Sequence, residues 1–320
     1  MTNQDEISAI KARIAKSESD THTWRVSGYG DSSIQAYDDA EVEELQLEAK
    51  IAESKPVIDK NTPPVFKRLS ALTSAAVTAT DGSIGDVISA LFDDRSWAIR
   101  YLVVDTGTWL SGRKVLISPY SVIVPVASDK NIDVTLTRQQ VQSSPNIDTH
   151  RPVTRQHERD YLRHYAYPEY WEGDGMWGMA AYPVMRTYVP SPTEIEIENA
   201  IREQDFRADD VHLQSSEKVT GYDIQAADES IGHVKDFIFD EASWAIRYLV
   251  VDTRNWWPGG RKVLVATHWI DSIDWAASTV QIKLTREQIM NSPQYDDTTK
   301  IDRDYEQRLY DAHKREGYWD

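Results

Sequence analysis

The sequence predicts a mainly β protein: two small β-barrels in tandem, a helical arm before them and a short helix after each barrel. Three observations lead to this prediction. The eleven residues SWAIRYLVVDT occur twice, at 96–106 and at 243–253. The match extends outward over roughly 80 residues per copy, too long a unit for a solenoid array, so it marks a duplicated domain. Each copy reads as short apolar segments separated by Gly, Asp and Asn turns, which favours a small barrel.

The repeat also sets the predicted order of segments. We expect, along the chain, a helical arm or hairpin (1–55), a linker (56–70), the first barrel (71–147, called copy 1), an aromatic tail and connector (148–216), the second barrel (217–295, called copy 2) and a C-terminal aromatic tail (296–320).

The helical arm is predicted from apolar residues at helical spacing. Ile7, Ile10 and Ile14 recur at i, i+3 and i+7, which indicates one apolar face. Two glycines in SGYGDSS (27–33) provide a break, so the arm can fold back as a hairpin or associate between chains. The alternative is a partly disordered, solvated arm.

Within each barrel the repeated run supplies the central strand. Residues 98–104 mix alternation with continuous apolarity, as a strand buried on both faces would. A glycine turn follows at Gly112 and Gly260, and KVLIS or KVLVA then gives another strand. Each barrel ends in a short helix with Thr137 or Thr285 as the N-cap residue.

The tails after the barrels also echo each other. Arg159-Asp160-Tyr161 pairs with Arg303-Asp304-Tyr305, and Tyr170-Trp171 with Tyr318-Trp319. Free aromatic residues at this density would promote aggregation, so we expect them to pack on the chain's own barrels or on a partner.

Composition excludes several functional classes. The net charge of −17 opposes polyphosphate and anionic lipid surfaces, which disfavours binding to nucleic acid or to a membrane. The chain has no cysteine, so disulfides and thiolate chemistry are excluded. No secretory signal and no run of 18 apolar residues is present. We therefore expect a cytoplasmic protein.

No motif predicts catalysis, a cofactor or a metal site. His150, His157 and His164 recur at seven-residue intervals, which would separate neighbours by ~10 Å along a helix, too far to share one metal ion. No nucleotide-binding loop and no nucleophile elbow is present. We therefore expect neither an enzyme nor a cofactor.

A set of charged residues recurs in both copies and predicts structural ion pairs at turns and barrel ends: Asp93, Arg100 and Asp105 in copy 1, and Asp240, Arg247 and Asp252 in copy 2. Because a nearby arginine lowers a carboxyl pKa, these carboxylates are poor proton donors at neutral pH.

The turn after each central strand carries tryptophan next to arginine. Such a composition is typical of interaction hot spots. We therefore predict a partner-binding role for these residues, and the alternative is a tryptophan that folds down to close its own barrel end. The residues are Trp109 and Arg113 in copy 1, and Trp256, Trp257 and Arg261 in copy 2.

The order of these motifs resembles the PRC-barrel domain, which is found in the H subunit of photosynthetic reaction centres and in a ribosome-maturation factor. The matching segments are Asp81–Gly85, Asp93, Trp97–Asp105 and Arg113–Leu116 in copy 1, and Asp228–Gly232, Asp240, Trp244–Asp252 and Arg261–Leu264 in copy 2. The resemblance implies a six-stranded barrel that serves as an adaptor. It carries over no membrane role, since the apolar anchor of the reaction-centre subunit has no counterpart here.

These observations favour a non-enzymatic interaction or assembly protein. We expect the two copies to pack as a pseudo-twofold pair, to bind one or more protein partners, and to form a homo-oligomer through residues 1–55. Two alternatives stay open. One is a small-ligand sensor with a pocket between the barrels lined by Tyr and Trp. The other is a ribosome-associated factor.

Overall fold

The computed structural model describes residues 11–16, 63–124, 126, 128–147, 152–171, 173, 175–178, 180–184, 212–253 and 260–319. The chain divides into two compact units, and copy 2 and all of copy 1 except residues 123–125 fall in one of them, residues 63–122 with 126–320. The other unit holds residues 1–62 with 123–125. Residues 11–16 are helical, and the rest of the predicted arm lies outside the described residues.

Copy 1 forms a mixed sheet, here called sheet 1. Its strands are ordered β5-β4-β3-β2-β6, with β2 and β6 parallel and the other pairs antiparallel. The central strand β4 is buried along its length except at its last residue, as predicted for a strand covered on both faces. The strands are β2 (Ala76–Ala79), β3 (Gly82–Asp93), β4 (Ile99–Asp105), β5 (Lys114–Ile117) and β6 (Asn131–Asp133).

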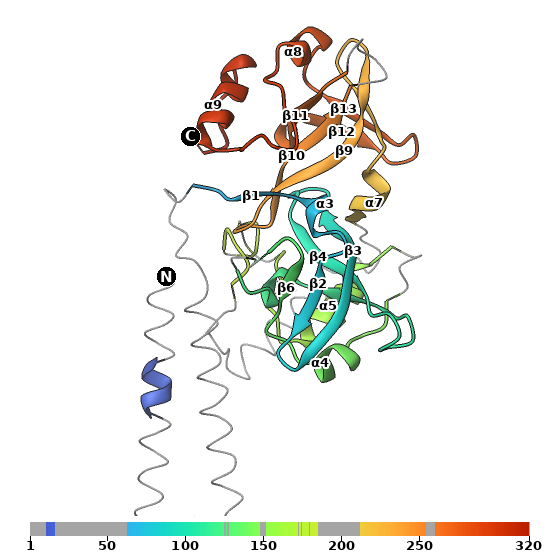
Figure 1. Cartoon of the computed structure of the whole chain (residues 1–320), viewed down its shortest axis with the longest axis vertical. Helices are drawn as coiled ribbons and strands as arrows, with labels where there is room; N and C mark the ends of the chain where they lie inside the picture. Colours follow the sequence, from blue (N-terminus) through green and yellow to red (C-terminus); the bar gives the residue numbers. More distant parts are fainter. Residues whose placement is uncertain are drawn as a thin grey trace, which may run out of the picture. The chain divides into compact units, whose positions relative to one another are not determined.

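Copy 2 repeats this arrangement in sheet 2, ordered β11-β10-β9-β8-β13-β12, with β8 and β13 parallel. Figure 1 shows the two sheets as the blue-green and orange parts of the unit. In both, the hydrogen-bonded ladder is open, so a mainly β fold is confirmed and barrel closure stays a prediction. The strands are β8 (Asp223–Gln225), β9 (Ser230–Asp240), β10 (Ala245–Asp252), β11 (Lys262–Ala266), β12 (Ile270–Asp274) and β13 (Thr279–Ile282).

Short helices follow each sheet where the sequence predicts them. Thr137 and Thr285 both close a capping box, in which the threonine side chain accepts from the N3 backbone N–H and the N3 glutamine side chain accepts from the threonine N–H. The helices are α3 (Leu69–Leu72), η1 (Pro119–Ser121), α4 (Arg138–Gln142), α5 (Arg155–His164), α7 (Ser216–Val219), η2 (Thr267–Trp269), α8 (Arg286–Met290) and α9 (Arg303–Ala312).

A close backbone approach explains the glycine of the repeated Ser-Ile-Gly. Gly85 has a φ of +154°, and a Cβ atom there would lie 2.0 Å from the carbonyl oxygen of Asp105. Gly232 in copy 2 has a φ of +140°, with the Asp252 carbonyl oxygen 2.1 Å from such an atom. Since only glycine lacks a Cβ atom, β3 and β9 can pass this close to the following strand only with glycine at these positions.

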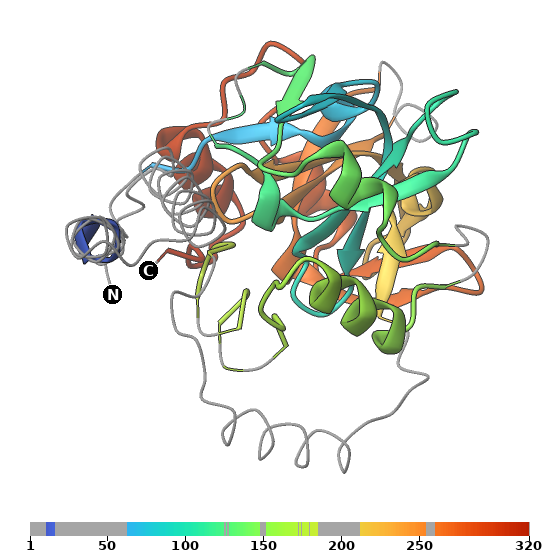
Figure 2. The same ribbon diagram turned by 90° about the horizontal axis from the view of Figure 1, so that it is seen from below.

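Two short strands cross between the copies. β1 (Phe66–Arg68) precedes copy 1 but pairs with β9 of copy 2, with Lys67 opposite Phe239. β7 (Leu213–Ser215) precedes copy 2 but pairs with β3 of copy 1, with Gln214 opposite Phe92. Figure 2 shows the light-blue β1 beside the orange strands of sheet 2. The predicted linker (56–70) and connector (148–216) therefore contain strands, which at three residues each are too short to show a sequence period.

The two repeated turns also contact each other. The Ile99 N–H donates to the Trp244 carbonyl and the Ile246 N–H donates to the Trp97 carbonyl, both at 2.8 Å. Trp97 and Trp244 share a positive φ, 58° and 56°. The two rings stack on phenylalanines of their own sheets, with centroid distances of 5.2 and 5.3 Å. These reciprocal contacts make the copies an isologous pair, as expected from the duplication.

Candidate interaction sites

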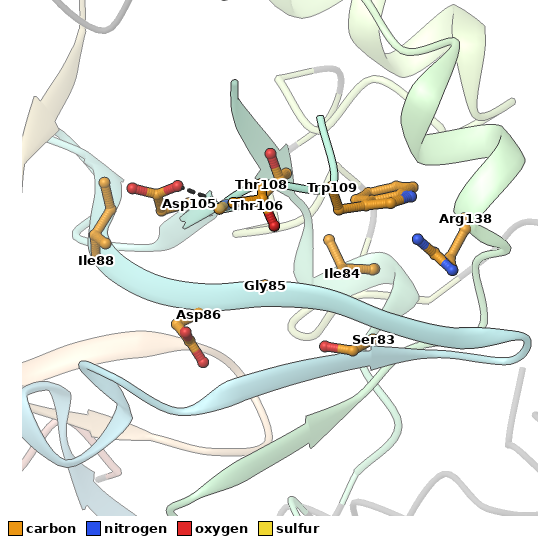
Figure 3. Close-up of a pocket in the computed structure, with 11 residues that line it drawn as sticks. Ser83, Ile84, Gly85, Asp86, Ile88, Asp105, Thr106, Thr108, Trp109 and Arg138 are labelled. Carbon is orange, nitrogen blue, oxygen red and sulfur yellow. Dashed lines mark hydrogen bonds between the residues drawn. The ribbon is translucent and has the colours of Figure 1, made fainter. Parts of the chain in front are cut away.

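The turn between β4 and β5 holds the first predicted partner-binding residue. Trp109 is half-buried, and the guanidinium carbon of Arg138 lies 4.4 Å from its ring centroid. Figure 3 shows the indole next to this arginine, which comes from α4. A cation placed over an indole face is favourable, and the ring keeps part of its surface exposed. Trp109 thus packs on an arginine of its own copy, and its role in partner binding stays a prediction.

A cavity of about 640 Å³ opens beside this turn. Two strand segments and the turn line it, and Figure 3 shows Ile84 and Thr106 facing the same space as Trp109. Its wall mixes apolar surface with hydroxyl, carboxylate and guanidinium groups. The lining comes from Ser83–Asp86, Ile88, Asp105–Trp109 and Arg138.

The two arginines that were predicted to bind a partner lie at the ends of helices. Arg113 donates to the carbonyls of Gln142 at 2.8 Å, Ser144 at 2.5 Å and Pro145 at 3.1 Å, just past α4. Arg261 donates in the same way to the carbonyls of Ile289 at 3.3 Å and Met290 beside α8. Both satisfy carbonyls at a helix end, which explains their recurrence.

The remaining predicted partner-binding residues, Trp256 and Trp257, lie outside the described residues. The turn of copy 1 is thus the one whose geometry is known. In copy 1 the structure brings Trp109 together with Arg138 rather than with Arg113.

Among the predicted ion-pair residues, Asp93 and Arg100 form a buried pair with an N–O distance of 3.9 Å. Burial alone would raise the pKa of Asp93, but Arg100 and the backbone N–H groups of Ser96 and Arg95 outweigh it and hold the pKa below its ordinary value. Asp93 therefore stays ionised and fixes the repeated turn.

The other members of the predicted set act mainly on turns and aromatic rings. Asp105 accepts from the Gly107 N–H at 2.8 Å, and Asp240 from the Ala242 and Ser243 N–H groups at 3.2 and 3.3 Å. The guanidinium carbon of Arg247 lies 4.3 Å from the Tyr318 ring centroid. Asp252 is fully buried at the end of β10.

The tails pack on their own copies, but one predicted correspondence between them is wrong. Helices α5 and α9 begin at Arg155 and Arg303, 148 residues apart, the same separation as Tyr170-Trp171 and Tyr318-Trp319. Arg303 therefore corresponds to Arg155. The pairing of Arg159-Asp160-Tyr161 with Arg303-Asp304-Tyr305 is shifted by about one helical turn.

This register reveals a buried carboxylate under each tail. The Glu158 side chain is fully buried; it accepts from Tyr101 at 3.3 Å and from Tyr170, and pairs with His212 Nε2 at 3.1 Å and Arg155 at 3.4 Å. Burial, followed by the negative charge of Glu158, raises the pKa of both tyrosines well above the ordinary value. Both tyrosines therefore remain neutral donors to the carboxylate.

Glu306 is the counterpart in copy 2. It accepts from Tyr248 at 2.5 Å and Tyr318 at 3.0 Å, and pairs with Arg303 at 2.9 Å. Burial raises the pKa of Glu306 above its ordinary value, and the hydrogen bond from Tyr248 and the charge of Arg303 partly oppose this. Neither glutamate was predicted from the sequence, although the constant separation of 148 residues, read back from Tyr170-Trp171 and Tyr318-Trp319, aligns them.

The histidines considered for a metal site bind protein groups instead. His157 Nδ1 lies 2.9 Å from the Thr154 hydroxyl, and His164 Nε2 lies 2.9 Å from the Gln140 carbonyl. His150 lies outside the described residues. Across the described part of the chain, no group of three or more His, Cys, Asp or Glu side chains is placed to hold a metal ion.

The fold and these sites define a mainly β protein with two intertwined copies of one sheet. Comparison with known families agrees for copy 2: residues 215–289 match the model of the PRC-barrel domain. No curated protein matches the chain. None of the helices in the described residues is long and apolar enough to cross a membrane.

Proposed function

We propose that this chain is a non-enzymatic, cytoplasmic protein-interaction protein that uses two PRC-like barrels as one assembly scaffold. The reciprocal exchange of β1 and β7 carries this proposal. It ties the copies into one body and so presents two related sets of surfaces to partners. The match of residues 215–289 to the PRC-barrel domain supports the same role, because such domains often take part in protein interactions.

The placement of the shifted titratable groups supports binding rather than catalysis. Groups with shifted pKa values are the usual candidates for acid–base chemistry when they line a cleft. Here Asp93 and Glu306 bond to turns and tyrosines, and neither lines the cavity beside Trp109. Their charges therefore serve the fold.

The oligomeric state tests the assembly role. Light scattering after size exclusion compares the full chain with a chain that lacks residues 1–60. We expect a defined oligomer for the full chain and a smaller species for the truncation, since residues 1–55 are predicted to associate. Two monomers would contradict the assembly role and leave a single-partner adaptor.

Partner binding is measured independently. The tagged full chain is purified from its own cells at low and high salt, and the bound proteins are quantified. An interaction protein retains a stoichiometric partner after purification. The substitution Trp109→Ala removes the half-exposed indole and is expected to weaken that binding by at least ~10-fold if the turn is the contact. Arg163→Ala, an exposed change on α5, is the control.

The cavity beside Trp109 supports a second function, the sensing of a small ligand. Its volume of about 640 Å³ lies within the range of ligand sites. It lies on copy 1, whereas the sequence predicts a sensor pocket between the barrels. A metabolite that binds there raises the melting temperature of the wild type and does so less for Trp109→Ala. Unchanged melting temperatures across a metabolite panel would leave this function without support.

A further inference from the structure

Four corresponding positions near the repeated turn differ in burial between the copies. In copy 1 all four expose 8% of their surface or less: Arg100, Tyr120, Tyr170 and the Ser243 that copy 2 contributes. The counterparts in copy 2 are more exposed. His268 is exposed, and Arg247, Tyr318 and Ser96, which copy 1 contributes, are half-buried. We call this second set the copy 2 patch.

Trp177 of the first tail covers the copy 1 positions. Its indole N–H donates to the Ser243 carbonyl at 2.8 Å. Its ring centroid lies 4.6 Å from the Arg100 guanidinium carbon and 5.1 Å from the Tyr120 ring centroid. Only 4% of the Trp177 surface is exposed. One tryptophan thus satisfies a carbonyl, stacks on a cation and buries a tyrosine.

The copy 2 patch presents the same groups without this cover. Arg247 already stacks on Tyr318 at 4.3 Å, as Arg100 stacks on Tyr170 at 3.8 Å. Val65, at the position of His212, exposes 55% of its surface. Among the described residues, no tryptophan stacks on Arg247.

The charge of the patch indicates what it binds. Burial and two nearby cations, Arg315 and Arg247, together lower the pKa of His268. In copy 1 the covering tryptophan belongs to the acidic sequence WEGDGMW (171–177). An acidic, aromatic segment thus complements the cationic and aromatic surface by charge and by cation–π contact.

We propose that the copy 2 patch binds an acidic, tryptophan-bearing segment of a partner protein, seated as Trp177 is seated in copy 1. The incoming indole N–H donates to the Ser96 carbonyl, and the ring stacks on Arg247 and His268. This inference rests on the proposed interaction function and names the chemistry of the partner.

The test titrates a fluorescein-labelled peptide of residues 172–181, EGDGMWGMAA, whose one tryptophan is Trp177, into the full chain and follows fluorescence anisotropy. We expect saturable binding that Arg247→Gln weakens at least ~10-fold, the size of a lost anchor contact. A peptide with Trp177→Ala should not bind. Arg163→Gln, which removes the same charge from an exposed position on α5, should bind as the wild type does.

Three results overturn the proposal. One is the absence of saturable binding up to about 1 mM peptide, the weak end of specific affinity. Another is equal binding by Arg247→Gln and Arg163→Gln, as would follow if the peptide displaced Trp177 from copy 1. The third is equal binding by the Trp177→Ala peptide. Circular dichroism melts establish that Arg247→Gln is folded.

Failure of this inference is distinguishable from failure of the proposed function. If a partner protein purifies in equal amounts with the wild type and with Arg247→Gln, the chain is an interaction protein but the patch is not its binding site. The opposite result is a chain that purifies without a partner and does not oligomerise but still binds the peptide at the patch. It would support the proposed chemistry of the patch and contradict the assembly role.

Discussion

The two copies share a backbone plan but differ in how their buried carboxylates are enclosed. Glu158 contacts Tyr101, Tyr170 and His212, which are all buried, and its arginine partner Arg155 exposes 12% of its side chain. Glu306 has tyrosines and an arginine at the same places, but Arg303 exposes 36% of its side chain. The difference indicates that the duplicated sheets determine where each group lies. The tail that follows each sheet determines how well the carboxylate and its partners are shielded from water.

The largest expected effect tests whether the copies are equivalent in backbone. Gly85→Ala and Gly232→Ala both place a Cβ atom within about 2 Å of a carbonyl oxygen. Each should lower the free energy of unfolding by about 4 kcal/mol, or prevent folding, because neither strand can move without breaking its ladder. Urea denaturation measures the loss in each copy.

Gly107→Ala is the matched control for these substitutions. Gly107 also has a positive φ, +55°, but nothing lies within 4 Å of an added Cβ atom. It should cost only about 1 kcal/mol, the intrinsic penalty of the left-handed conformation. If Gly85→Ala and Gly107→Ala cost the same, close approach does not explain the glycine.

A smaller effect should separate the two carboxylates. Glu158→Gln removes the buried carboxylate that pairs with His212 and Arg155 and should cost about 3 kcal/mol. Glu306→Gln should cost about 1 kcal/mol, because its partner Arg303 reaches water and burial already disfavours the ionised glutamate. Guanidinium denaturation of both variants measures the difference. Equal losses in the free energy of unfolding would show that the two carboxylates are equally shielded from water.

The last expected effect, similar in size to the difference between the two glutamates, is a pH dependence that arises in copy 2. His313 packs on Trp269 and bonds to Ser292 at 2.9 Å, and burial together with Arg315 lowers its pKa from 6.5 to about 4. At pH 5 the unfolded chain binds a proton at this histidine that the folded chain does not. Stability should therefore fall by about 2 kcal/mol between about pH 7 and pH 5.

His313→Gln should remove this part of the pH dependence while keeping a hydrogen bond to Ser292. The corresponding position in copy 1 is Tyr165, whose pKa burial raises to about 12, so it does not titrate in this range. Thermal melts of wild type and variant at several pH values check the prediction, and parallel curves would assign the pH dependence to other groups.

The sequence predicted the elements that carry a strong local signal. The buried β4, the Thr137 and Thr285 caps and the isologous pairing all follow from periodicity, capping chemistry and duplication. The crossing strands β1 and β7 could not be predicted, because three residues hold no period and their partners are far away in the chain.

The candidate sites were predicted less completely. Trp109 is half-exposed as a contact residue should be, but the arginine on its ring is Arg138, which no spacing argument singled out. Arg113 bonds to carbonyls at a helix end. Glu158 was missed because a glutamate on a polar helix looks solvated until the tyrosines around it are known.

The crossing strands have a consequence for synthesis on the ribosome. Phe92 pairs with Gln214, which is translated 122 residues later. At about 5–20 residues per second, β3 emerges about 6–24 s before its partner strand β7. During this interval Leu91–Asp93 at the end of β3 lack their native neighbour and are open to pairing with other chains. Folding of the first half is thus completed only after the second half has begun to appear.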